Sequence, residues 1–202
     1  MKLENNNVEL AGVIVSEPEY SHAVYGEQFY KLLLETRRES GVADTIPLMI
    51  SERLFDCNAK CTGIAVRVAG SFRSYNKHEE GKNHLILSVF VRETEPDADE
   101  DENEIRLGGY VCKIPVYRKT PLGREIADLL LAVNRPYGKS DYIPCICWGR
   151  NARFASAFEV GEHVQILGRI QSREYVKKLS ETETQKRIAY EVSVSKLECV
   201  GI

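Results

Sequence analysis

The chain has 202 residues, of which 43% are hydrophobic and 28% charged, and its formal net charge is −3. These values are typical of a globular protein with room for one large or two small domains, and they exclude a disordered or fibrous chain. No apolar run approaches the roughly 20 residues that span a bilayer, and the start MKLENNNVEL lacks the apolar segment of a secretion signal. We therefore expect a cytoplasmic protein.

Charge is spread unevenly along the chain. Residues 93–104 (ETEPDADEDENE) contain eight acids and no base, a composition typical of a solvated linker. Residues 105–202 contain 16 Lys and Arg against 10 Asp and Glu, so this part is basic. A basic region suits a polyanionic partner.

One pattern occurs twice, at an offset of 97 residues. Three pairs of segments carry it: 8–12 and 105–109, 32–34 and 129–131, 44–47 and 141–144. Gly70 matches Gly168 after a single inserted residue. The repeat predicts two domains of one fold, residues 1–92 and 105–202, joined by the acidic linker 93–104.

Each copy consists of short segments with strand periodicity, separated by turn residues. In the second copy we expect strands at 105–114, 124–134, 141–148, 163–175 and 187–198. Short helices are expected at 152–158 and, in the first copy, at 52–56. Five strands with one helix between the third and fourth is the order of the OB-fold, a closed Greek-key barrel. The sequence therefore predicts an all-β protein of two tandem OB-fold barrels, each with one short helix.

The last two strands of each copy are joined by different links. Residues 75–83 join them in the first copy, and the longer, polar residues 176–186 (VKKLSETETQK) join them in the second. We expect the second link to be a mobile hairpin loop.

The strand predicted at 141–148 has no ordinary polar face. With a period of two, Ile143, Cys145 and Cys147 share one face, and the other carries Tyr142 and Trp148 together with apolar neighbours. The small side chains suit the core. The aromatic face must then be covered by a second layer or left open to stack on a flat ligand.

Motifs for catalysis or for metal binding are missing from the sequence. There is no nucleophile with a supporting His and acid, no phosphate-binding glycine loop and no apolar carboxylate pair, so we predict no enzyme. Cys57 and Cys61 could form half of a metal site, but no second pair follows at a suitable spacing. Cys145 and Cys147 are expected to be buried thiols. No cofactor is predicted.

Aromatic and basic residues alternate along the second copy. They are Tyr137, Tyr142, Trp148 and Tyr175, with Arg135, Lys139, Arg150, Arg153, Arg169, Arg173, Lys177 and Lys178. A base stacked on an aromatic ring contributes about 1–3 kcal/mol in any sequence context, and cationic side chains contact phosphates. The pattern favours a surface for single-stranded nucleic acid. The alternative stays open that the rings are core or interface residues and the bases an ordinary solvated surface.

In these segments the chain resembles the bacterial single-stranded DNA-binding protein (SSB) family. The resemblance covers nearly all of the second copy, in order, through 105–109, 123–135, 141–152, 160–175 and 189–195. It implies an OB-fold protein that binds single-stranded DNA without sequence preference in replication, repair or recombination, in association with the nucleoid. It also implies that Tyr137, Tyr142, Trp148 and Tyr175 are the stacking residues.

The first copy keeps the framework and loses the stacking residues. Thr45 stands where Tyr142 does, Ile50 is expected where Trp148 is, and Lys77 stands near the position of Tyr175. The candidates that remain there are Arg37, Arg38, Arg73, Tyr75 and Lys77, with Phe72 nearby. We expect the first barrel to bind DNA weakly or to pair mainly with another barrel.

The resemblance also bears on partners. Family members work with four barrels, so it implies a homodimer of this two-barrel chain. The family's acidic tail with an apolar tip does not follow Ile202, so recruitment of replication or repair enzymes through such a tail is not expected. Two other functions stay open: a protein-interaction module of a primosome or conjugation machine, and a single-strand RNA binder.

Overall fold

A computed structural model describes residues 5–79, 81–96, 98–178 and 184–201. The elements of the first half are β1 (Asn6–Ile14), β2 (Glu19–Val24), β3 (Glu27–Arg37), β4 (Ala43–Ser51), β5 (Ala65–Glu79) and β6 (Lys82–Pro96). Those of the second half are β7 (Glu102–Val111), β8 (Val116–Lys119), β9 (Glu125–Asn134), the 3-10 turn η1 (Pro136–Gly138), β10 (Ser140–Trp148), α1 (Arg150–Ala155), β11 (His163–Lys178) and β12 (Thr184–Cys199). Within the described residues, no helix has the length and apolar character needed to cross a membrane.

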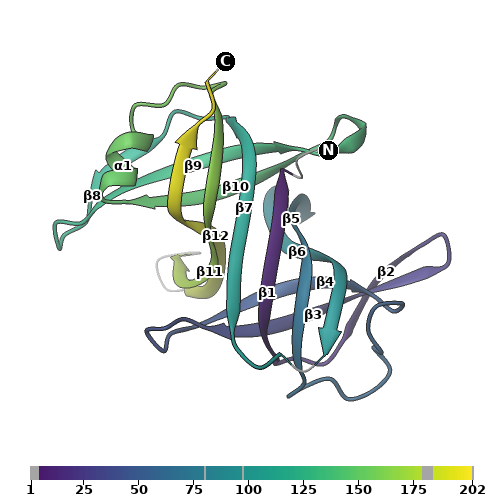
Figure 1. The fold of residues 1–202 in the computed structure, drawn as a ribbon. Coiled ribbons are helices and arrows are strands. Elements are labelled where there is room, and N and C mark those ends of the chain that lie inside the picture. The colour runs from purple at the N-terminus through teal and green to yellow at the C-terminus, as the bar shows by residue number, and fades with distance from the viewer. Residues whose placement is uncertain (1–4, 80, 97, 179–183, 202) are drawn as a thin grey trace.

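Each half closes into a five-stranded barrel, as predicted for an OB-fold (Figure 1). In the first, β1 pairs with β3 and β5, β3 with β4, and β5 with β6, and a parallel pair of β4 and β6 completes the ring. The ring is repeated by β7, β9, β10, β12 and β11. The short strands β2 and β8 extend β3 and β9 outside the rings, which the sequence did not predict.

The cores of the two barrels are built from equivalent positions. Alternate residues of each strand point inward, as the pleat requires. Fully or nearly buried pairs at the offset of 97 are Val8 and Ile105, Leu10 and Leu107, Leu32 and Leu129, Leu34 and Leu131, Ile46 and Ile143, and Leu48 and Cys145. The repeat in the sequence is therefore a repeat of the core.

The two barrels are joined by an antiparallel pair of their first strands, β1 and β7. Val8 lies opposite Ile105, its own equivalent in the repeat. This register places a pseudo-two-fold axis at the junction, so the strand order on one side is mirrored on the other. Contacts made by one barrel toward its neighbour are consequently expected in pairs.

The acidic run does not form a single loop between the barrels. Its first residues, 93–96, complete β6, and β7 begins at Glu102. The carboxylate of Glu102 pairs with Arg67 of β5, and the amide of Arg37 donates to Asp101 Oδ2 at 2.9 Å. The end of the acidic run is thus attached to the first barrel.

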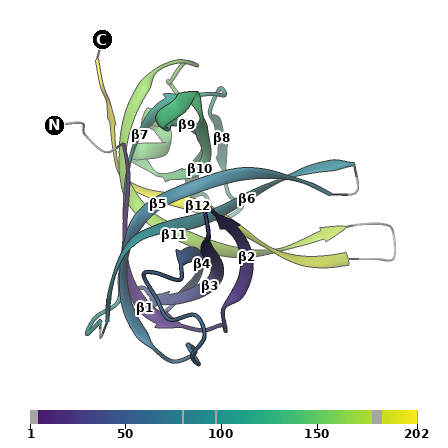
Figure 2. The ribbon, with the colours of Figure 1, turned by 90° about the vertical axis from the view of Figure 1, so that its right-hand side faces the viewer.

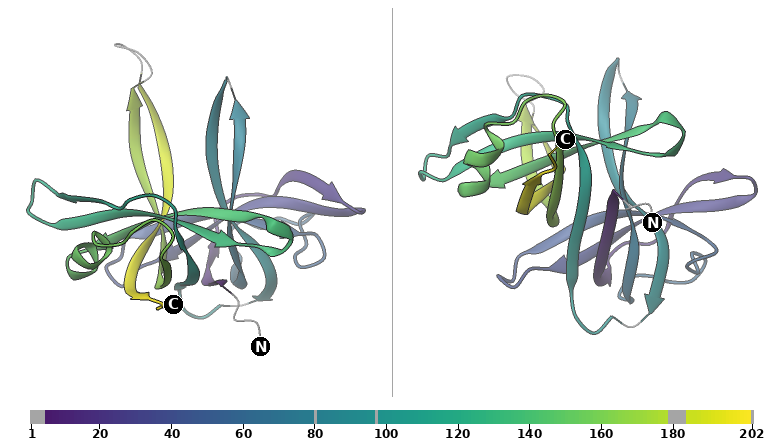
Figure 3. Two further views of the ribbon diagram at one scale, coloured as in Figure 1. Left: turned by 90° about the horizontal axis from the view of Figure 1, so that it is seen from above. Right: turned by 45° about the horizontal axis from the view of Figure 1, so that its top comes forward.

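Two long hairpins, β5–β6 and β11–β12, project from the same side of the molecule (Figures 2 and 3). Paired backbone extends farther than predicted, because β11 reaches Lys178 and β12 starts at Thr184. The predicted loop 176–186 is therefore partly strand. Its central residues, 179–183, lie outside the described residues.

The helix predicted in the first barrel is wrong, and the one in the second is displaced. Residues 52–56 form turns, in which the Arg53 amide donates to Ser51 Oγ at 3.2 Å and the Asn58 amide to Asp56 Oδ1 at 3.0 Å. Such side-chain to backbone bonds compete with helix formation. In the second barrel α1 covers 150–155, rather than 152–158.

Candidate nucleic-acid interface

Strand β10 carries the predicted aromatic face. Ile143, Cys145 and Cys147 are at most 3% exposed, whereas Tyr142 and Trp148 are 45% and 38% exposed. Burial raises the pKa of Cys147 to about 12, so this thiol stays protonated. Ile146 shares the face of Trp148 but is buried (6% exposed), so the open face is not continuous.

Trp148 lies in a groove of about 660 Å³ on the second barrel. The groove is bounded by polar and basic side chains of both barrels, among them Arg38, Arg124, Arg169, Gln171, Ser193 and Ser195. It brings together three residues that the sequence singled out: Trp148, Arg169 and Arg38. Sequence reasoning missed Arg124, although it directly precedes β9, whose Ile126 pairs with Trp148.

Tyr142 lies at the opposite end of β10, beside the first barrel. Trp148 lies six positions farther along the strand, a distance of about 20 Å. The Tyr142 amide donates to Ser74 Oγ of β5 at 2.7 Å. The two rings therefore occupy opposite ends of one strand face.

The remaining second-barrel candidates are distributed over the surrounding surface. Tyr137 is fully exposed in the turn between β9 and β10, with φ of 65°, and Lys139 follows it. Tyr175 is 37% exposed on the β11 hairpin, where Arg173 pairs with Glu191 at 3.8 Å. The side chain of Lys177 lies outside the described residues.

Two further basic residues belong to α1, the helix that follows β10. Arg150 is exposed at the first position of this helix, and Arg153 pairs with Glu125 of β9 at 3.4 Å. The partner of Arg153 reduces the positive charge that it can offer to a ligand.

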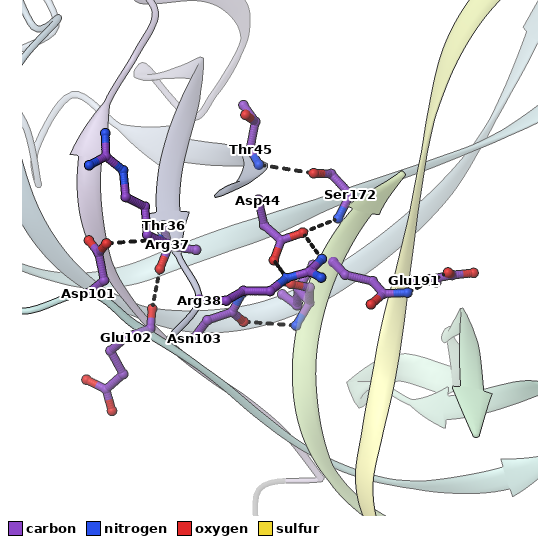
Figure 4. Close-up of polar contacts among 12 residues, drawn as sticks. Thr36, Arg37, Arg38, Asp44, Thr45, Asp101, Glu102, Asn103, Ser172 and Glu191 are labelled. Carbon is purple, nitrogen blue, oxygen red and sulfur yellow. Dashed lines mark hydrogen bonds and ion pairs between the residues drawn. The ribbon is translucent and has the colours of Figure 1, made fainter. Parts of the chain in front are cut away.

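Arg38 and its equivalent Arg135 each have a buried carboxylate partner. Arg38 donates two bonds of 2.7 Å to Asp44, which also accepts the amide of Ser172 from the other barrel at 2.9 Å (Figure 4). These bonds raise the pKa of Arg38. Arg38 and Arg135 therefore each form an ion pair inside the protein, while part of each side chain remains exposed.

The second pair, Arg135 and Asp141, is less well aligned. Arg135 Nε lies 3.1 Å from Asp141 Oδ2, an ion pair without hydrogen-bond alignment, while the Ser74 amide donates to Oδ1 at 2.6 Å. Burial raises the pKa of Asp141, although the Ser74 bond and nearby arginines oppose the shift.

First-barrel candidates are less favourably placed. Phe72 is fully buried in the core and cannot stack on a base. Tyr75 and Lys77 are exposed on the β5 hairpin, and Arg37 pairs with Glu35 at 3.5 Å. The position equivalent to Trp148 is Ser51, not Ile50, because Ser51 pairs with Phe29 as Trp148 pairs with Ile126. Ile50 points into the core, like Cys147.

A cluster of rings covers the same outer face of the first barrel. His22 stacks on Phe29 with centroids 5.1 Å apart, Phe29 lies 5.8 Å from Phe90, and the guanidinium of Arg73 lies 4.0 Å from the Phe90 centroid. These rings use one another and Arg73 as partners. In the described part of the first barrel, the rings on this face therefore pack against one another, whereas Trp148 has no ring partner among the described residues.

Cysteine and acidic residues of the described part form no metal site. No group of three or more His, Cys, Asp or Glu is suitably arranged there. Cys57 is 8% exposed, and burial raises its pKa to about 11, which disfavours the thiolate that a metal would need.

Comparison with known proteins gives the same picture for the second barrel. Residues 102–200 match the sequence model of the Single-strand binding protein family. Over 80 residues the chain is 35% identical to a single-stranded DNA-binding protein of Halalkalibacterium halodurans, covering 36% of this chain and 48% of that protein. It is 34% identical to single-stranded DNA-binding protein B of Bacillus subtilis over a similar stretch, which is 71% of that protein. The matches span about half the length of most of these relatives.

The fold of the whole chain also has a known counterpart. The crystal structure of wild-type single-stranded DNA binding protein from Thermus aquaticus superposes with a TM-score of 0.79 and 21% identity. The superposition covers 98% of this chain and 93% of that one. An identity of 21% supports a conclusion about the fold alone, and the shared fold agrees with the tandem OB-fold arrangement described above.

Proposed function

Since this chain belongs to the single-strand binding protein family, we propose that it binds single-stranded DNA without sequence preference, in replication, repair or recombination. The observation that carries the proposal is the exposed indole of Trp148 in a groove bordered by Arg38, Arg124 and Arg169. An aromatic ring stacks on any base, and guanidinium groups bind phosphates of any sequence.

The second barrel, residues 105–202, provides the main binding surface in this proposal. Trp148 and Tyr142 stack bases at the two ends of β10, and Tyr137 and Tyr175 extend the surface onto the neighbouring turn and hairpin. The bases assigned to the same surface are Arg135, Lys139, Arg150, Arg153, Arg169, Arg173 and Lys177. The first barrel, residues 1–92, contributes less, because Phe29, Phe90 and Arg73 on its equivalent face already pack against one another and His22.

We also propose that two chains associate, which would bring four barrels together. Within one chain, β1 and β7 already join two barrels through equivalent residues. A mass in solution of twice the 22.9 kDa chain is the expected result.

Replacing Trp148 by Ala should weaken binding of oligo-dT by about 1–3 kcal/mol, the contribution of one stacked base. The affinity is measured by fluorescence anisotropy of a labelled oligonucleotide, since the variant has no tryptophan. Tyr110→Ala serves as the control, because Tyr110 is a similarly exposed ring (43%) on β7 that does not line the groove. Wild-type affinity of the Trp148 variant, or its failure to fold, would assign Trp148 to structure instead of binding.

A further inference from the structure

The groove that holds Trp148 ends at the junction of the two barrels. An adjoining depression of about 570 Å³ shares four of its residues, Arg38, Asn103, Glu104 and Arg169, and continues over the turn after β3. Arg169 comes from β11 of the second barrel and Arg38 follows β3 of the first. We call Arg38 and Arg169 the junction arginine pair.

The junction arginine pair has more positive charge than its surroundings neutralise. Both oxygens of Asp44 are taken by Arg38 and the Ser172 amide (Figure 4). Arg169 forms no ion pair with a described residue, and its Nε is buried there without a hydrogen-bond partner. Burial and the charge of Arg38 lower the pKa of Arg169, yet a guanidinium remains protonated. Arg38 and Arg169 therefore carry two positive charges beside one carboxylate, Asp44, whose two oxygens already accept hydrogen bonds.

The acids near the pair limit where an anion can lie. Glu104 lines the groove but pairs with Arg106 at 2.7 Å. The adjoining depression is also lined by the acids Glu39, Asp101 and Glu102, against the single further base Arg37. The charge balance is therefore more favourable for an anion at the pair than in the depression next to it.

The ion pair of Arg135 and Asp141, which is the repeat equivalent of Arg38 and Asp44, also has a second arginine nearby. This arginine, Arg73, comes from a different position in the repeat than Arg169 does. Arg73 approaches Arg135 and Asp141, and its Nε is also buried without a partner in the described part of the chain. Arg73 corresponds to Gln171 in the repeat, whereas Arg169 corresponds to Ser71, so simple duplication does not account for both arginines. Arg73 is covered by Phe90, at 4.0 Å, whereas Arg169 lines the groove.

We propose that Arg38 and Arg169 bind a backbone phosphate of the single strand at the end of the Trp148 groove. A guanidinium has five N–H donors, and Arg38 uses only one each from Nε and Nη2 on Asp44, so its other N–H groups can share one phosphodiester with those of Arg169. The first barrel then completes the binding site of the second by supplying Arg38. This inference rests on the proposed function, since it assigns a phosphate contact within the same site.

The test compares Arg169→Gln with the wild-type full chain in titrations with oligo-dT at several salt concentrations. Arg169 is the residue to change, because removing Arg38 would leave the Asp44 carboxylate buried and unpaired. We expect affinity to fall about tenfold, the effect of one charge-assisted hydrogen bond. The slope of log K against log salt should become shallower by about 0.7, the value for one phosphate on a single strand. Arg169→Lys should restore the slope, since it retains the charge.

Arg53→Gln is the matched control. It removes the same charge from a side chain that is 69% exposed, pairs with Glu27 and lies outside both parts of the groove. It should leave the affinity and the salt slope unchanged. Quenching of Trp148 at saturation and the urea midpoint should be the same in Arg169→Gln as in wild type.

Three outcomes would overturn the inference. A wild-type affinity and salt slope for Arg169→Gln, while oligo-dT still quenches Trp148, would remove the phosphate contact and leave the proposed function intact. A lower urea midpoint with an unchanged salt slope would make Arg169 a structural residue. If wild type itself binds no oligo-dT, the proposed function fails and the inference fails with it.

Discussion

Asp44→Ala should lower the free energy of unfolding by about 3 kcal/mol, near the low end of the cost of breaking a buried ion pair. Asp44 is fully buried and accepts hydrogen bonds from Arg38 of its own barrel and Ser172 of the other. Its loss leaves a guanidinium without a partner and a buried amide unsatisfied at the barrel junction. The low end applies because the Arg38 side chain is 26% exposed and is partly screened by water. Urea unfolding of the full chain measures the change.

Two comparisons sharpen this result. Asp128→Ala removes a carboxylate whose pair with Arg118 is exposed on both sides, so it should cost less than about 1 kcal/mol. Asp141→Ala should cost less than Asp44→Ala, because Arg135 is not aligned for hydrogen bonding and burial already raises the pKa of Asp141. Equal losses for Asp44 and Asp128 would mean that the junction contact does not stabilise the protein.

Gly70→Ala should cost about 3 kcal/mol, the upper end of the range for overpacking. Gly70 lies at a bulge of β5, where an added Cβ would lie 2.2 Å from the carbonyl oxygen of Phe90 on β6. Since both groups belong to backbone, no side-chain rotation can relieve the clash. Its repeat partner Gly168 has the same constraint, with 2.4 Å to the carbonyl oxygen of Ser193. The close approach explains why both copies have glycine at this position.

Gly108→Ala is the matched control for Gly70→Ala. Gly108 also lies in a strand, β7, but its nearest neighbour would be 3.6 Å from the new Cβ, an ordinary contact. Alanine there should change the free energy of unfolding by less than about 1 kcal/mol. The change should be stabilising, because alanine lowers the conformational entropy of the unfolded chain. The two variants can be compared by thermal or urea unfolding. Similar losses in both would contradict the steric explanation for Gly70.

Local patterns in the sequence were sufficient to predict the barrels. The repeat at an offset of 97 and the alternation of Ile143, Cys145 and Cys147 with Tyr142 and Trp148 express the core and the strand period directly. The misplacement of Ile50 was a slip of one residue, because the offset of 97 that matches Thr45 to Tyr142 matches Ser51 to Trp148. A register error of one residue moves a side chain to the opposite face, and the pairing of Ser51 with Phe29 confirms the register that the offset gives.

Contacts between distant segments could not be predicted in this way. The pairing of β1 with β7 and the bond from Ser172 to Asp44 join residues from different halves, and no local periodicity encodes them. Arg38 and Arg135 were identified as cations without their buried partners, although each partner lies only six residues farther along the chain, and Arg124 was overlooked. The turns at 52–56 depend on the hydroxyl of Ser51 and the carboxylate of Asp56, which outweigh the helical pattern.

The proposed function requires the second barrel to present an open aromatic ring, flanked by cations, to unpaired bases. Fluorescence of the full chain, titrated with oligo-dT at low and high salt, tests it most directly, because the chain contains a single tryptophan. We expect saturable quenching of Trp148, with an affinity that falls steeply as salt rises. An unchanged emission while anisotropy shows the oligonucleotide to be bound would contradict it.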